Sequence, residues 1–403
     1  MRRNLLLLCA GAAVALAIIF WPKDEMCPEL KSAIASSPRS EELTALYEAT
    51  PKASQRDMAY LLVNMPAGDR DTMNLELLAE NVAYAAKARE EFAWSKDIPE
   101  QVYLSDVLPY FVVDEVRDSW RRELYELFAP AVAECSTMEE AIRVVNGNLP
   151  RMTGVDYNTL REKTNQSPRE SMRQGMASCT GLAILLVDAL RSVGIPARFA
   201  GTASWHDNRG NHSWTEVWMD GRWWVTEFYM PSKLDHLWFM ADASKAIAED
   251  RNYAIYATHF GPSEDWFPMV WCGEEDDTPV EELPQWIGAE NVTERYVALA
   301  YEQYTRHLEA GTHTFLRIAG YKERGRKEHS GDRIAMGVDV FCGTEQMGGG
   351  LTAGPLRDMN DLFSVLLPKN SEYELRYYNA AGELQRQSIA LGEEPITVEI
   401  YLQ

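Results

Sequence analysis

The first part of the chain carries apolar residues at intervals of three and four, which is the period of an amphipathic helix. This pattern runs through residues 75–85 and returns in residues 120–133. Ser136, with Glu139 three positions later, predicts a further helix start of the capping-box type. Three prolines are expected to break the helices: Pro109, Pro130 and Pro150. We therefore predict a helical domain over residues 25–152.

One strongly apolar helix is predicted next, over residues 182–193. Gly194 suits a left-handed turn at its end, and Pro196 cannot continue it. Ser178 is a good N-cap residue. Cys179 is therefore expected in the first turn of this helix.

The residues that follow alternate between apolar and polar, as a half-buried strand does, and then meet a hairpin signal. If the turn is Asp220-Gly221, Met219 pairs with Arg222 across two antiparallel strands. His212 and Glu227 then share one face of the hairpin as diagonal neighbours, roughly 7–8 Å apart between backbones. The pattern predicts that their side chains meet.

The C-terminal part reads as a series of short strands separated by Gly, Asn and Pro. The predicted strands are residues 335–341, 362–367, 373–378 and 396–402. Ala380-Ala381-Gly382 is a plausible hairpin turn, and an acidic connector over residues 273–284 precedes the whole region. We predict a small β-sandwich over residues 288–403, which makes the protein α+β overall.

The N-terminal segment, residues 1–24, is interpreted as an export signal or membrane anchor rather than as part of the fold. Its apolar run over residues 5–21 is longer than the core of most signal peptides and close to the shortest spanning helix. An uncleaved anchor formed by residues 4–21 is favoured over a cleaved signal followed by secretion. In both cases we expect the body of the protein on the periplasmic or cell-surface side.

The predicted elements bring together three residue types that suit nucleophilic catalysis. A cysteine at a helix N-terminus is stabilised as a thiolate by the helix dipole and by free N–H groups, which also suit an oxyanion. Cys179 is placed there, although a lone cysteine is by itself more often a small buried residue. His212 is then the candidate base, and Glu227 the carboxylate that orients the imidazole.

Three strings in this region resemble the transglutaminase-like superfamily. They are Gly-x-x-Ser-Cys-Thr-Gly-Leu at residues 175–182, Gly-Ile-Pro-Ala-Arg at 194–198, and Gly-Asn-His-Ser-Trp-Thr-Glu-Val-Trp at 210–218. The chain resembles the bacterial exported members with a helical N-terminal part, over about residues 60–310. The resemblance implies a papain-like core, here placed at residues 153–272, with the cysteine at a helix start and the histidine and aspartate on adjacent strands.

Carried over by motif, Cys179 is the nucleophile and His212 the base. Glu227 stands where most members of the family have Asp, and its longer side chain leaves Asp235 as an alternative third residue. The Ca²⁺ dependence of animal transglutaminases is not carried over, because no ligand loop is evident.

Further residues are weaker candidates for substrate binding. Gln174 or Gln166 could donate a hydrogen bond to an oxyanion, although the simpler interpretation is that each is an ordinary surface residue. Trp205 is expected on a loop between core strands, where it lines a substrate cleft or packs in the core. The remaining tryptophans suit a core, and the other histidines show no metal-ligand spacing. We expect no metal and no cofactor.

The composition of the chain limits the classes of binding partner that we expect. The formal net charge is −22, and the one dense basic stretch is residues 322–327, which argues against nucleic acid. The membrane is expected as a partner through the N-terminal segment alone. A disulfide is possible among four cysteines, but the sequence does not pair them: Cys27, Cys135, Cys272 and Cys342.

These features predict cysteine-dependent acyl transfer through a thioester intermediate, with hydrolysis of an amide or peptide favoured. The expected substrate is a protein or peptide, with cell-envelope material as one candidate. Protein crosslinking is the second interpretation, because it needs a site that excludes water. A non-catalytic binding module and a scaffold for envelope proteins are the alternatives from other classes.

Overall fold

The computed structural model describes most of the chain after the N-terminal segment. The described residues are 26–158, 160–206, 210–228, 234–235, 239–261, 263–270, 287–325, 332–355 and 362–403. The predicted anchor and the acidic connector lie outside them. Among the helices that are described, none is both long enough and apolar enough to cross a membrane.

The chain divides into two compact units, each with its own contacts. The first comprises the described parts of Met1–Ala203, Asn211–Leu234 and Ala248–Val292. The second comprises the described parts of Ser204–Gly210, Asp235–Ile247 and Thr293–Gln403.

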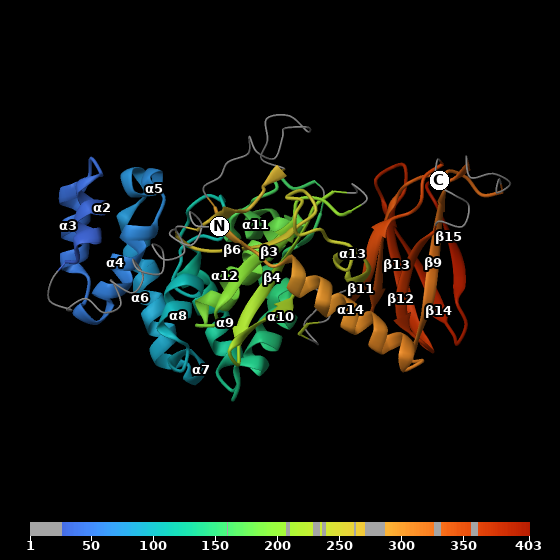
Figure 1. The fold of residues 1–403 in the computed structure, drawn as a ribbon, viewed down its shortest axis with the longest axis horizontal. Coiled ribbons are helices and arrows are strands. Elements are labelled where there is room, and N and C mark those ends of the chain that lie inside the picture. The colour runs from blue at the N-terminus through green and yellow to red at the C-terminus, as the bar shows by residue number, and fades with distance from the viewer. Residues whose placement is uncertain are drawn as a thin grey trace. The chain divides into compact units, whose positions relative to one another are not determined.

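The first unit begins with a run of helices, coloured blue to green in Figure 1. They are α2 (Pro28–Ala35), α3 (Ser40–Ala49), η1 (Lys52–Ser54), α4 (Gln55–Asn64), α5 (Ala67–Thr72), α6 (Leu75–Glu91), α7 (Ala93–Lys96), α8 (Glu100–Asp106), α9 (Trp120–Val132), α10 (Met138–Thr153) and α11 (Pro168–Gln174). The predictions of helix over residues 75–85 and 120–133 are confirmed by α6 and α9.

Two local predictions for these helices were wrong. The capping box of α10 is formed by Thr137 and Glu140, one residue later than predicted, because Glu140 reaches back to the backbone N–H of Thr137. Pro130 and Pro150 lie inside α9 and α10 instead of breaking them. Each proline is in the last turns of its helix, where the buried apolar face outweighs the single lost hydrogen bond.

A six-stranded sheet completes the first unit, in the order β5-β4-β3-β6-β8-β7. Its strands are β3 (Ala197–Thr202), β4 (His212–Met219), β5 (Arg222–Thr226), β6 (Ile255–Thr258), β7 (Asp265–Trp266) and β8 (Gly288–Asn291). A separate parallel pair joins β1 (Asp156–Tyr157) to β2 (Met176–Ala177). Helix α12 (Cys179–Ser192) packs on β3 and β4 on one side and on α9 and α10 on the other (Figure 1).

The predicted hairpin and its register are confirmed. Met219 pairs with Arg222 and Thr215 with Thr226, across a turn at Asp220 and Gly221. Both turn residues have positive φ, at 54° and 82°, as a tight turn between twisted strands requires.

One hydrophobic core runs through the whole first unit. It includes Leu43 from the early helices, Leu124 from α9, Leu185 from α12, and Val217 from the sheet, each fully buried. The predicted helical domain 25–152 therefore shares a core with the region predicted as residues 153–272. The boundary drawn between them at residue 152 stays a prediction.

Buried arginines join the helices to the connector that follows α8. Arg121 of α9 donates hydrogen bonds to the carbonyls of Val107 at 2.7 Å and Pro109 at 2.8 Å. The same side chain donates to the Arg191 carbonyl at 3.0 Å, near the end of α12. Since unpaired carbonyls are costly to bury, this guanidinium stabilises an irregular segment inside the core.

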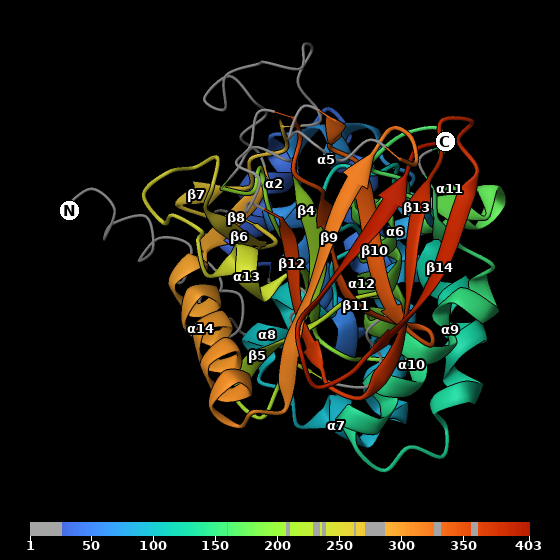
Figure 2. The same cartoon turned by 90° about the vertical axis from the view of Figure 1, so that its right-hand side faces the viewer.

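The second unit contains helices α13 (Met240–Ala243) and α14 (Thr293–Glu309) and two sheets. One sheet has the order β11-β10-β13-β14 and the other β12-β9-β15, and their strands can be followed in Figure 2. The strands are β9 (His313–Tyr321), β10 (Gly337–Cys342), β11 (Glu345–Leu351), β12 (Phe363–Pro368), β13 (Ser371–Tyr378), β14 (Leu384–Leu391) and β15 (Ile396–Tyr401).

Most pairings in these two sheets are antiparallel, and β15 pairs with β9 in parallel. Residues from both sheets, among them Ile318, Val340 and Leu375, form one cluster, as a β-sandwich requires. The four strands predicted from sequence agree with β10, β12, β13 and β15 to within two residues at each end.

A glycine-rich strand was missed by the sequence pattern. Residues 348–350 are glycines within β11, and they lack the β-branched or aromatic side chains that mark a strand. A Cβ atom added to Gly348 would lie 2.5 Å from a methyl carbon of Val365 in β12. The glycine therefore allows the two sheets to approach closely.

Gly194 provides a test of how tightly the end of α12 is packed. It has φ of +76°, and an added Cβ would lie 2.5 Å from Ser95 Oγ. We expect Gly194→Ala to lower the free energy of unfolding by about 3–5 kcal/mol, because strain and a steric clash add. Chemical unfolding of both proteins measures this difference.

Gly221→Ala is the matched control, since Gly221 has φ of +82° but nothing lies near its added Cβ. The free energy of unfolding of this variant should be lower than that of the wild type by about 1 kcal/mol, because backbone strain alone acts. Equal losses for the two variants would contradict the close packing of Gly194 against Ser95.

Candidate active site

Cys179 is the first residue of α12, as predicted, and its side chain is half-buried. The helix begins there because Ser178 Oγ accepts a hydrogen bond from the Gly181 N–H at 3.0 Å. The same hydroxyl donates to the Thr164 carbonyl at 2.7 Å, which fixes the loop before the helix. The cap thus holds the thiol at the positive end of a buried helix.

The start of α12 is tied directly to β4, the strand that carries His212. Thr180 Oγ1 and Ser213 Oγ lie 3.2 Å apart and share a hydrogen bond. One turn later, Thr215 Oγ1 donates to the Ala183 carbonyl at 3.4 Å. These buried contacts set the position of the strand relative to the helix end.

His212 connects the thiol to a carboxylate. Its Nε2 lies 2.7 Å from Glu227 Oε1, and each of these two side chains is 12% exposed. The imidazole also interacts with the Cys179 thiol closely enough to change the pKa of both groups.

The thiol is shifted toward its ionised form. Burial by itself would raise the pKa of Cys179, and the charge of Glu227 acts in the same direction. The hydrogen bond and charge of His212, together with the Thr180 N–H, outweigh both effects and bring the pKa below the usual 9.0.

The imidazole is shifted toward its protonated form. Burial opposes the charge on His212, but the charge of Glu227 and hydrogen bonds with Cys179 and Glu227 raise its pKa to about 10. A thiol pKa below and an imidazole pKa above their usual values both favour the thiolate–imidazolium form over the neutral pair. Such a pair can attack an acyl carbon and then protonate a leaving group.

Of the two candidates for the third residue, Glu227 is the one for which the structure gives a contact with His212. Glu227 follows the end of β5 and reaches the Nε2 atom of His212. The role of Asp235 as the alternative stays a prediction. The longer side chain of Glu227 therefore does not prevent the hydrogen bond that the sequence pattern predicted.

The amide nitrogens of both candidate glutamines are engaged in hydrogen bonds, and an oxyanion role for either residue stays a prediction. The Gln174 amide is engaged by Glu162, accepting from its N–H at 3.0 Å and donating to its carboxylate at 3.3 Å. The Gln166 amide is buried and donates to the Met176 carbonyl at 2.9 Å. This contact supports the strand β2 that leads into Cys179.

Trp205 lies in the second unit, where it is 6% exposed. Its ring centroid is 5.6 Å from that of Phe239, and its backbone N–H donates to the Gly210 carbonyl at 3.0 Å. Packing within its own unit accounts for these contacts, and its predicted place in a substrate cleft stays a prediction.

Asn146 of α10 supports the site and was missed by the sequence analysis. Its Nδ2 donates to the Glu227 carbonyl at 2.8 Å and to Thr226 Oγ1 at 3.0 Å. The side chain is 2% exposed, so both bonds form away from water. A long-range contact of this kind leaves no periodic signal in the sequence.

The described residues contain no group of three or more His, Cys, Asp or Glu side chains arranged to hold a metal ion. Three of the four cysteines considered for a disulfide lie in the described part, and all three are free: Cys27, Cys135 and Cys342.

The arrangement of thiol, imidazole and carboxylate is that of a cysteine–histidine–carboxylate site on a helix and an adjoining hairpin. Residues 128–228 match the family model of the transglutaminase-like superfamily, and this range contains all three side chains. This part of the chain is thus a transglutaminase-like core. No match was found among curated proteins.

Two solved structures are similar to the chain at low identity. A proposed cysteine protease from Cytophaga hutchinsonii is 16% identical over 34% of this chain and 45% of its own, with a TM-score of 0.27. A transglutaminase from red sea bream is 11% identical over 76% of this chain and 63% of its own, with a TM-score of 0.30. The chain thus spans less than two thirds of either protein, and at these scores neither likeness carries an argument.

Asn146→Ala tests whether this side chain positions Glu227. Without its two hydrogen bonds the end of β5 is held less firmly, so the contact between Glu227 and His212 weakens. We expect the pKa of His212 to fall below about 10, measured by NMR titration of the imidazole. A merely structural role would lower the melting temperature without moving this pKa.

Asn148→Ala is the matched control on the same helix. Asn148 donates to the Val144 carbonyl within α10 and accepts from Arg151, and neither contact involves β5. The pKa of His212 should stay unchanged in this variant. An unchanged pKa in both variants would show that Asn146 does not act on Glu227.

Proposed function

We propose that this protein is a cysteine-dependent acyl-transfer enzyme that works through a thioester intermediate. The observation that carries the proposal is the position of His212 between the Cys179 thiol and the Glu227 carboxylate. Transglutaminase-like proteins are typically cysteine-dependent enzymes, and the family match of residues 128–228 agrees with this assignment.

In the proposed first step, the Cys179 thiolate attacks the carbonyl carbon of an amide. The negative charge that develops on the oxygen is stabilised by backbone N–H groups at the start of α12. The C–N bond then breaks, His212 gives its proton to the leaving amine, and the acyl group remains on sulfur as a thioester. Glu227 keeps the imidazole oriented and stabilises its charge.

In the second step, neutral His212 takes a proton from water, and the resulting hydroxide attacks the thioester. The carboxylic acid leaves, and Cys179 and His212 return to the thiolate–imidazolium pair. Hydrolysis of an amide or peptide is the favoured outcome, which makes the protein a cysteine protease or amidase. If an amine takes the place of water, the same thioester gives a crosslink.

The substrate is proposed to be a protein or peptide, with cell-envelope material as one source. We also propose that the body of the protein is exported and tethered by residues 4–21, or secreted after cleavage. This placement is supported by the apolar N-terminal run in the sequence.

A screen of peptide and amine substrates, with wild type beside Cys179→Ser, tests the proposal. We expect release of amine from peptide amides by the wild type, and a decrease of about 10⁴-fold or more in the variant. Incorporation of an added amine into the acyl product, measured by mass spectrometry, separates crosslinking from hydrolysis.

Alkylation by iodoacetamide near neutral pH separates an enzyme from a binding module that merely keeps the fold. Cys179 should react fast in the wild type and slowly in His212→Ala, because the imidazolium that stabilises the thiolate is lost. Cys135, which is also partly exposed, serves as the internal control and should react equally in both proteins. Equal, slow alkylation of Cys179 in both would favour the binding module.

A further inference from the structure

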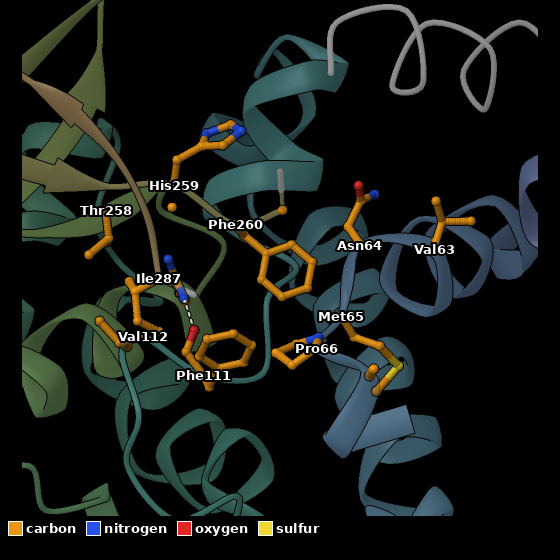
Figure 3. Close-up of a pocket in the computed structure, with 14 residues that line it drawn as sticks. Val63, Asn64, Met65, Pro66, Phe111, Val112, Thr258, His259, Phe260 and Ile287 are labelled. Atoms are coloured by element: carbon orange, nitrogen blue, oxygen red, sulfur yellow. Dashed lines mark hydrogen bonds between the residues drawn. The ribbon is translucent and has the colours of Figure 1, made fainter. Parts of the chain in front are cut away.

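The first unit contains a cavity of about 330 Å³ that the proposed reaction does not use (Figure 3). It is lined by Val63, Asn64, Met65, Pro66, Ala67, Phe111, Val112, Arg191, Thr258, His259, Phe260, Gly261, Ile287 and Gly288. Arg191 follows Cys179 by twelve positions on α12, which is about 18 Å along the helix. The cavity is therefore a different site from the one at Cys179.

A buried guanidinium forms part of the cavity wall. Arg191 is 3% exposed, and its Nε donates to the carbonyls of Asp106 at 3.1 Å and Ala197 at 2.9 Å. Nη1 donates to the Phe111 carbonyl at 2.9 Å, the dashed line in Figure 3. Nη2 has no hydrogen-bond partner among the described residues. The guanidinium is thus fixed in place, the charges of Asp188, Asp106 and Glu115 act on it within the core, and Nη2 is the donor left for a ligand.

Other polar groups lie around the same space. His259 lines the cavity, and its imidazole has no hydrogen-bond partner among the described residues. Burial lowers the pKa of His259, so the ring is neutral near pH 7 and offers one donor and one acceptor. The Asn64 amide donates to the Tyr60 carbonyl at 2.8 Å, which leaves its oxygen as a further acceptor.

The rest of the lining is apolar and mostly buried. Phe111, Phe260 and Ile287 are 8%, 7% and 3% exposed, and the two phenylalanine rings meet edge to face with centroids 5.4 Å apart. Ala67 is exposed, and Pro66 is half-buried, so the lining reaches the protein surface at the start of α5.

We propose that this cavity binds a small monocarboxylate with an aromatic or branched aliphatic body. The fixed guanidinium favours an anion and repels a cation, and the apolar lining favours an uncharged body over a second charged group. A phosphate needs more donors than the lining supplies. The volume is near the lower end of ligand pockets, which suits a small molecule rather than a polymer.

Phenylacetate is the probe, and binding to the full chain is measured by isothermal titration calorimetry. We expect saturable binding with Kd below about 1 mM. Phenylacetamide, which keeps the ring and loses the charge, should bind at least about tenfold more weakly. Inorganic phosphate should not compete with phenylacetate.

Substitutions at and away from the cavity test whether phenylacetate binds there. Arg191→Met removes the charge but also three hydrogen bonds to buried carbonyls, and this variant risks misfolding. Val63→Phe instead fills the cavity from α4 and keeps Arg191, so it should weaken phenylacetate binding at least about tenfold. Val116→Phe, at a valine that is 52% exposed and outside the lining, is the matched control and should bind as the wild type does.

The inference is overturned if phenylacetate does not bind, if phenylacetamide binds as tightly, or if Val63→Phe leaves the affinity unchanged. The readout is binding and involves neither Cys179 nor turnover. Its outcome is therefore independent of whether the proposed acyl-transfer reaction takes place.

Discussion

The site depends on the burial of α12 on every side. Every residue of this helix from Leu182 to Leu190 is less than 5% exposed, with the sheet on one side and α9 and α10 on the other. A helix in such surroundings cannot slide or rotate without opening cavities, and those cost several kcal/mol. Its N-terminus, and with it Cys179, therefore has a fixed position relative to β4.

The charges of the site follow from that fixed position. A thiolate in a partly buried place needs a nearby positive charge, and His212 supplies it because Glu227 supports its protonated form. The three groups are coupled, so a change at one alters the proton affinity of the others. Asn146 extends this coupling to α10, because it holds the backbone from which Glu227 projects.

The features of the site that could be predicted are those with local causes. Ser178 as N-cap, Gly194 at the helix end and the Asp220-Gly221 turn each have a residue type that their geometry requires. Together they placed Cys179 in the first turn and His212 beside Glu227. The register of the hairpin followed directly, since a two-residue turn leaves one pairing for the strands.

The features that could not be predicted depend on contacts between distant parts of the chain. Asn146 meets Glu227 across 81 positions, and no spacing rule connects them. The cavity beside Arg191 arises where α4, the segment after α8 and the end of β6 come together. Strand β11 was not predicted because glycine has a low strand propensity. Gly348 is required there by close packing against Val365, and this contact cannot be seen in the local sequence.

The proposed reaction requires a thiolate at Cys179 that is stabilised by protonated His212. The most direct measurement is the ultraviolet absorbance of the thiolate as a function of pH, taken as the difference between wild type and Cys179→Ser. We expect a transition midpoint below 9.0, which moves above 9.0 in His212→Ala because burial and the charge of Glu227 then outweigh the Thr180 N–H. A wild-type midpoint at or above 9.0, unchanged by His212→Ala, would contradict a thiolate stabilised by His212.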